Sequence, residues 1–175
     1  MAATTDVPIY RYGTADGHQP QALPEKASES IYAGTIAVTA AGYAKDAGSS
    51  PASTDLVWGV YNGQYDSQPH FTSPMAGGTT NGLHVVGVEQ GTFLLNSATG
   101  PDAITEANLG AGCYVYDNVT VALTNSTGSR ALAGTVVAVS AIGATTNAIY
   151  TGKVAVRLGA VQPITGGTPA GNGNV

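Results

Sequence analysis

The sequence has little charge. Charged residues make up 10% of its 175 residues, and the formal net charge is −5 at pH 7, whereas soluble domains typically carry about 25% charged residues. Lysine and arginine together number six and are scattered, so they form no basic stripe that could bind phosphates. We therefore expect no direct nucleic-acid binding. Because weakly charged surfaces are poorly protected against association, this composition favours a protein whose surface is covered by partners.

Cysteine and long apolar runs are also scarce. The lone cysteine, Cys113, excludes an internal disulfide, and its place in an apolar run predicts a small buried hydrophobe. No apolar run approaches the ~18 residues that would span a bilayer. The N-terminus lacks the apolar core of a signal peptide. We expect no membrane partner and synthesis inside the producing cell.

Recognisable catalytic and ligand-binding patterns are missing as well. No G-x-S-x-G sequence occurs, and neither Gly77-Gly78 nor Gly166-Gly167 continues into the Lys-Ser/Thr of a phosphate-binding loop. Asp102 and Glu106 would share a helix face, which is more typical of a capped surface turn than of a catalytic pair. The histidines lie far apart without metal-ligand spacing: His18, His70 and His84. We expect no enzyme activity, no cofactor and no metal.

The clearest positive pattern lies between Leu109 and Ser140 and predicts three consecutive strands. The first contains Cys113 to Tyr116 and ends at Asp117-Asn118, a pair that suits a tight turn. From Val119 to Thr124 apolar and polar residues alternate, as they do in a half-buried strand. A third, β-branched run covers Leu132 to Val139. This order of strand, turn and strand predicts a meander.

Further strands are expected on both sides of this meander. They are a hairpin over 35–39 and 43–45, a buried strand over 56–61 with Trp58 as a core anchor, one long bent strand or two over 83–88 and 91–95, and closing strands over 148–150 and 153–161. One short helix is expected between Thr99 and Gly110, because Pro101 suits its first turn and Gly110 its end.

A weak internal similarity suggests that the chain repeats itself. Ala33-Gly34-Thr35 with 57–60 resembles 111–113 with 133–136, because each half shows a glycine entering a strand and another inside a later strand. We predict an all-β fold, a small antiparallel barrel or sandwich built from two such units. The expected organisation is an extended N-terminal arm over 1–30, a β domain over 31–161 and a flexible Gly/Pro-rich tail over 162–175.

Two segments are candidates for partner contact. The N-terminal segment 1–30, the leader, is either disordered or an arm that becomes ordered on a neighbouring molecule. Its strong apolar residues lie close together, so the first group of candidate contact residues is Ile9, Tyr10, Arg11 and Tyr12. The segment from 62 to 81 is long for a connection inside a compact domain. Its aromatic side chains give the second group, Tyr65, His70 and Phe71.

Several strand sequences resemble the capsid cement, or decoration, proteins of tailed bacteriophages. The resemblance rests on these segments: Ala103-Ile104 before the run Gly110–Asp117, then Val119–Ala122, Leu132–Val136 and Lys153–Leu158, with Gly87–Leu95 similar to the family's "G-V-x-x-G-x-F" strand. It covers roughly residues 31 to 160. The leader and the 62–81 segment depart from the family pattern.

The resemblance implies a protein without catalysis that binds the outside of an icosahedral head. It would bridge subunits of the major capsid protein and stabilise the shell as a homodimer or homotrimer, on the exterior of a virion made in the cytoplasm of a bacterial host. The alternative function is a head-fibre or tail-associated receptor-binding domain, with Tyr65, His70 and Phe71 as its contact residues. A hydrolase on a β scaffold is the third and weakest hypothesis.

Overall fold

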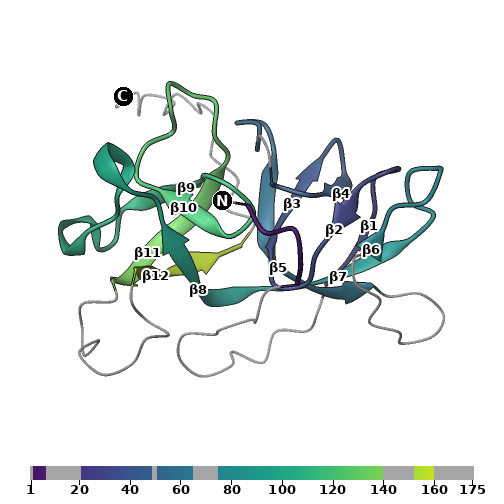
Figure 1. Ribbon diagram of the computed structural model, residues 1–175, viewed down its shortest axis with the longest axis horizontal. Helices are drawn as coiled ribbons and strands as arrows, with labels where there is room; N and C mark the ends of the chain where they lie inside the picture. Colours follow the sequence, from purple (N-terminus) through teal and green to yellow (C-terminus); the bar gives the residue numbers. More distant parts are fainter. Residues whose placement is uncertain (1, 7–20, 49–50, 65–74, 140–151, 160–175) are drawn as a thin grey trace, which may run out of the picture.

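Strands dominate the described part of the chain. A computed structural model describes residues 2–6, 21–48, 51–64, 75–139 and 152–159 (Figure 1). The elements are β1 (Gln21–Pro24), β2 (Ser30–Ile31), β3 (Ile36–Ala40), β4 (Tyr43–Lys45), β5 (Leu56–Gln64), β6 (Met75–Ala76), β7 (Val85–Glu89), β8 (Gly91–Ser97), the 3-10 turns η1 (Gly100–Asp102) and η2 (Glu106–Asn108), β9 (Gly112–Val115), β10 (Thr120–Ala122), β11 (Leu132–Val139) and β12 (Lys153–Leu158). The predicted all-β class is confirmed.

The first half of the chain forms a five-stranded sheet in the order β1-β7-β5-β3-β4, with antiparallel neighbours throughout. Its two edges meet, because Glu25 forms a parallel bridge with Ala44, and the Lys26 amide donates to the Ala44 carbonyl at 2.9 Å. The sheet therefore curls back on itself. Beside it, β2 pairs with β6.

The second half forms a closed barrel whose strands follow the same plan. Its order is β8-β12-β11-β9-β10, closed by parallel pairing of β10 with β8. When the five strands of each half are labelled a to e along the chain, the strand order in both sheets is a-e-d-b-c. In both halves, strand c closes the sheet against strand a, or the residue just after it, and this closing contact is parallel. The two halves therefore have one topology, and they lie side by side (Figure 1).

Hydrogen bonds outside the regular ladders repeat between the halves. Four bonds of the first half have counterparts in the second: Gly34 N to Tyr61 O with Gly110 N to Val136 O, Tyr61 N to Thr35 O with Val136 N to Ala111 O, Lys26 N to Ala44 O with Ala98 N to Val121 O, and Glu25 N to His84 O with Ser97 N to Gly152 O. Register shifts also coincide, at Trp58 and Ala133 and again at Asn62 and Val137. The suspected internal repeat is therefore present in the backbone.

A glycine inside the fourth strand of each half lets neighbouring backbones approach closely. Gly59 and Gly134 have φ values of 153° and 159°. A Cβ atom on Gly59 would lie 1.9 Å from the Glu89 carbonyl oxygen, and one on Gly134 would lie 2.1 Å from that of Arg157. No side chain fits there, so both glycines are structural requirements of the repeat.

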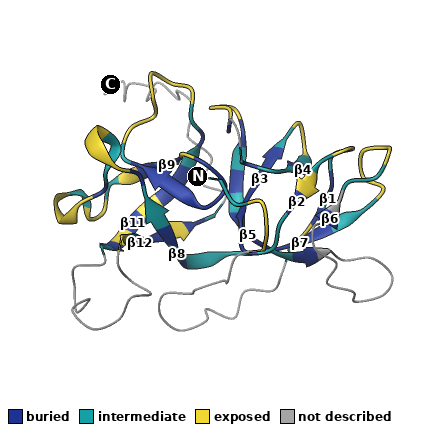
Figure 2. Cartoon of the chain, in the orientation of Figure 1, coloured by how far each residue is buried: buried dark blue, intermediate teal, exposed yellow. Residues whose placement is uncertain are grey.

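Two buried clusters hold the fold together, and buried residues are found on the strands of both halves (Figure 2). The smaller fills the first half and contains, for example, Leu23, Tyr61 and Val86. The larger fills the second barrel, and it also contains Val38 and Val60 of the first half. Since one buried cluster spans both halves, they share an apolar interface.

Two strand predictions need correction, and a third is decided between its alternatives. The predicted meander is wrong, because β11 pairs with β9 and not with β10. Ordered strands begin before Ile31, because β1 pairs with β7 inside a segment predicted to be an arm. Of the two alternatives for 83–88 and 91–95, two strands is confirmed: they lie in different sheets with Gln90 between them, and so they connect the halves.

Smaller differences concern the other elements. The helical signature between Thr99 and Gly110 folds as two 3-10 turns instead of one short helix. The segment 62–81 contributes the end of β5 and the short strand β6. The hairpin over 35–39 and 43–45 is confirmed as β3 and β4. Trp58 is only half-buried, at the edge of the smaller cluster, where its indole donates to the Thr39 hydroxyl at 2.9 Å.

Candidate functional site

Asn118 joins the two halves. It lies in the turn after β9 and is fully buried. Its side-chain amide donates to a carboxylate oxygen of Asp46 at 2.9 Å. Its backbone carbonyl accepts a hydrogen bond from the backbone amide of Ile36 at 2.7 Å. One residue of the second barrel thus bonds both the start of β3 and the end of β4, which fixes how the halves meet.

The same asparagine holds the described N-terminal residues. Its Oδ1 accepts the Ala3 amide at 2.6 Å, and its Nδ2 donates to the Ala3 carbonyl at 2.8 Å. These two hydrogen bonds resemble the two N–H···O bonds that a pair of opposite residues forms in an antiparallel sheet. Further along, a carboxylate oxygen of Asp6 accepts the Ala33 amide at 3.0 Å. Residues 2–6 therefore bind their own chain, between the halves (Figure 1).

Three acidic residues lie near the point where the first sheet closes: Glu25, Glu29 and Asp46. Glu25 is 1% exposed, and neither of its carboxylate oxygens has a hydrogen-bond partner. Burial, together with the negative charge of Glu29, raises the pKa of Glu25 to about 7. Burial also raises the pKa of Asp46, against the hydrogen bond that Asn118 donates to it. At neutral pH, Glu25 is therefore poised to take up or release a proton.

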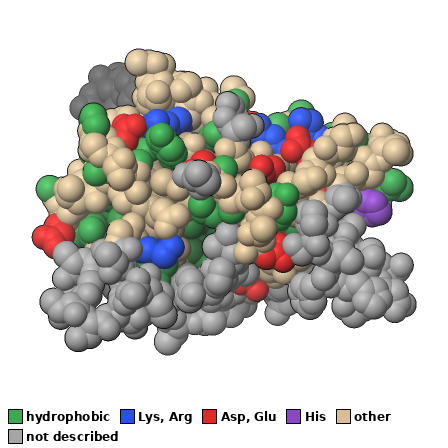
Figure 3. Space-filling model, viewed as in Figure 1, with side chains coloured by type: hydrophobic (Ala, Val, Ile, Leu, Met, Phe, Trp, Pro, Cys, Tyr) green, Lys and Arg blue, Asp and Glu red, His purple; other side chains and the backbone are tan. Residues whose placement is uncertain are grey.

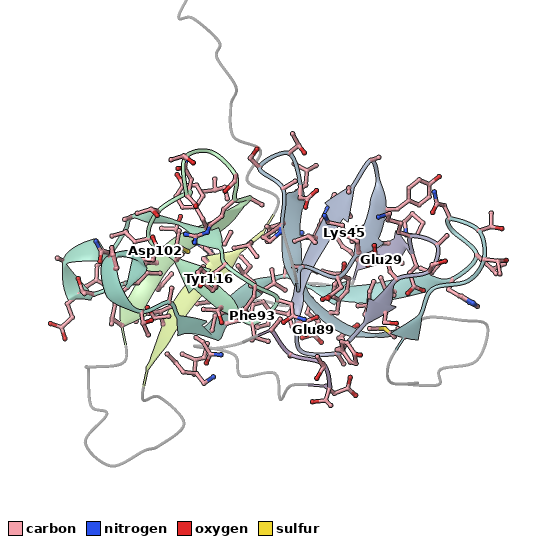
Figure 4. The ribbon with its side chains drawn as sticks, turned by 45° about the horizontal axis from the view of Figure 1, so that its top comes forward. Glu29, Lys45, Glu89, Phe93, Asp102 and Tyr116 are labelled. Carbon is pink, nitrogen blue, oxygen red and sulfur yellow. The ribbon has the colours of Figure 1, made fainter. Side chains whose placement is uncertain are left out.

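The neighbours of this group are already engaged. Glu29 accepts from the Lys26 ammonium at 3.1 Å and from the Asp46 amide at 3.4 Å. Lys45 points to Asp55, with 2.7 Å between the ammonium nitrogen and the carboxylate oxygen. Figure 4 shows Glu29 and Lys45 in the first half. Across the described ranges, no three His, Cys, Asp or Glu side chains are grouped so that they could hold a metal ion.

A stripe of apolar side chains is exposed on the outer face of the second barrel. The apolar stripe consists of Leu109, Tyr114, Tyr116, Leu132 and Val137. Leu109, Tyr116 and Val137 are 48%, 46% and 45% exposed. Tyr114 and Leu132 face each other across the β9–β11 pair, and the Gly110–Val136 hydrogen bond sets Leu109 beside Val137. The stripe thus runs over β9 and β11.

An ion pair between Arg130 and Asp102 borders the apolar stripe. The Arg130 guanidinium lies 4.7 Å from the centre of the Tyr116 ring and bonds the Asp102 carboxylate at 2.9 Å. Figure 4 shows Asp102 and Tyr116 on the second barrel. Hydrogen bonds from the Thr124 hydroxyl and from Arg130 lower the pKa of Asp102, so this carboxylate is ionised at neutral pH. On the visible face of the molecule, charged side chains are few among the apolar and other atoms (Figure 3). This part of the molecule is suited to contact with another protein surface.

Sequence analysis predicted two groups of residues to contact partners. Both groups lie outside the described residues: Ile9, Tyr10, Arg11 and Tyr12 in 7–20, and Tyr65, His70 and Phe71 in 65–74. Cys113 is fully buried, as predicted, and burial raises the pKa of its thiol to about 12. In the described part of the chain, no helix has the length and apolar character needed to cross a membrane.

Sequence reasoning missed the apolar stripe, although a signal was present. In β9 and the residue after it, Tyr114 and Tyr116 alternate with Cys113 and Val115, so both faces of this segment are apolar. One of these two apolar faces had to point away from the barrel interior. Asn118 and Glu25 gave no comparable signal, because their burial depends on contacts far along the chain.

Comparison of the chain with family models, with curated proteins and with solved structures found no match.

Proposed function

We propose that this protein is a capsid decoration protein of a tailed bacteriophage. It binds the outer surface of the icosahedral head, bridges subunits of the major capsid protein and stabilises the shell. It acts as a homo-oligomer on the virion exterior, and it is made in the cytoplasm of the bacterial host. The resemblance of its strand sequences to the cement proteins suggests this function.

The observation that carries the proposal is the repeat. One chain holds two modules of the same topology, joined through a shared buried cluster and the buried Asn118. A rigid pair of modules can contact two neighbouring subunits at once, and the second contact then forms at high effective concentration. Bridging therefore needs only modest interfaces on each subunit.

The character of the surface also supports the proposal. Charged residues are few, and the partly buried ion pair between Arg130 and Asp102 is internally neutral. Such a surface approaches other copies of itself on a crowded shell without strong repulsion. The apolar stripe supplies area for protein contact.

A binding experiment tests the proposal. Purified full-length protein is mixed with undecorated, expanded heads of tailed phages, and bound protein is measured by co-sedimentation. We expect saturable binding at a fixed ratio to the major capsid protein, and heads that resist heating better. Lack of binding to every expanded head tested would remove the proposal. Binding to glycans or host cells that is lost on Phe71→Ala would favour the receptor-binding alternative.

A further inference from the structure

The outer face of strands β3 and β5 in the first half is equivalent to the outer face of β9 and β11 in the second half, but the two faces differ in burial. In the first half, the outward side chains of β3 and β5 are buried in the same cluster as the interior of the second barrel: Ile36, Val38, Val57 and Val60. Their counterparts on β9 and β11, matched by register, are exposed or half-buried: Gly112, Tyr114, Leu132 and Thr135. The first half has a covered face, and the second has the same face uncovered.

The uncovered face keeps the character of a contact surface. Tyr114 and Leu132 stand where Val38 and Val57 stand in the first half. Around them lie Leu109 and Val137, both nearly half exposed. Burying such side chains removes apolar area from water, so the exposed stripe is a driving force for association.

We propose that the β9–β11 face of the second barrel is a self-association surface, which binds the same face of a second copy of this chain. The reason for this occupant lies within the chain. The equivalent face of the first half is already packed against the second barrel, so in this chain that kind of face serves contact between two units of the repeat. A two-fold contact is the simplest closed arrangement, because one patch then serves both partners.

The composition of the face fits close approach of two copies. Gly112 and Thr135 lie opposite each other across the strand pair, and these small residues let two sheets come together. Arg130 at the border is bonded to Asp102, so it enters the contact with its charge compensated. The inference does not depend on the capsid function, because it follows from comparing the two halves.

The test is the mass of the full chain in solution. We expect light scattering coupled to size exclusion to give twice the chain mass at micromolar concentration. Val137→Lys places an ammonium on the uncovered face and should weaken association at least tenfold, giving the mass of one chain. Leu83→Lys is the matched control, because Leu83 is 59% exposed but lies in the loop before β7. That variant should keep the doubled mass.

A second variant guards against misfolding. Thr135 is exposed and polar, so Thr135→Lys should fold normally, as judged by circular dichroism, and should still reduce the mass to that of one chain. A wild-type chain that stays monomeric at 100-fold higher concentration would overturn the proposal. So would an unchanged doubled mass in folded Thr135→Lys, because association would then use another surface.

Discussion

The side-chain amide of Asn118 and the carboxylate of Asp46 lie 2.9 Å apart and form a hydrogen bond across the junction of the two halves. Asn118 is fully buried and also holds the backbone of Ala3. Its polar atoms are satisfied by groups from three separate segments, so the junction is specified by geometry as well as by apolar contact.

Asn118→Ala should destabilise the protein by about 2–4 kcal/mol, because it removes several buried hydrogen bonds and leaves their partners unpaired. Urea unfolding measures the change. Asn125→Ala is the matched control, since Asn125 is exposed and its side chain accepts one bond, from the Gly128 amide. The control should cost about 1 kcal/mol or less. Equal losses in the two variants would show that the junction does not depend on Asn118.

Gly59→Ala and Gly134→Ala should each destabilise the protein by about 3 kcal/mol or more. In both, the new methyl group meets a carbonyl oxygen of the neighbouring strand at about 2 Å, which forces the backbones apart. Gly159→Ala is the control, because a Cβ there meets nothing within 4 Å. Thermal unfolding should rank the two variants together, far below the control. A large loss in only one of them would contradict their equivalence.

The stability of the protein should fall as the pH rises from about 4.5 to about 7. Across this window Glu25 is ionised in the unfolded chain, where its pKa is 4.5, but protonated in the folded chain, where its pKa is about 7. The folded state then binds more protons than the unfolded state, so raising the pH favours unfolding. The slope contributed by Glu25 cannot exceed about 1.4 kcal/mol per pH unit.

Glu25→Gln tests this origin, because the amide cannot ionise. We expect the variant to show a flatter pH dependence between 4.5 and 7 and to be more stable than the wild type at pH 8. Glu106→Gln, at an exposed position in η2, should leave the profile unchanged. If Glu25→Gln kept the wild-type slope in urea titrations, the fall would have to come from other groups, such as Asp46.

Removing residues 1–6 and removing residues 1–30 should give different results. The shorter truncation takes away the segment held by Asn118 and Ala33, and both halves should stay folded with a lower melting temperature. The longer truncation deletes β1 and with it the closing strand of the first sheet. It should unfold that half, which circular dichroism and proteolysis would detect. A stable product lacking residues 1–30 would mean that β1 is dispensable.

Local pattern predicted most strands of the described chain but not how they pair. Alternation in β10 and β-branched runs in β5 and β11 are properties of a few neighbouring residues, and these strands lie close to where they were expected. Pairing is decided by distant contacts. The tight turn at Asp117-Asn118 was correctly located, yet β11 returned to β9, because closure of the barrel brings β10 against β8.

The residues by themselves determined an all-β protein with little charge, one cysteine inside a strand and a faint repeat of glycines. Only the tertiary structure decided that the repeat is a curled sheet and a closed barrel of one topology, that Asn118 is buried at their junction, and that one face of the barrel stays open. The physical reason is that strand order, burial and exposure depend on which distant segments meet, and local periodicity carries no information about that choice.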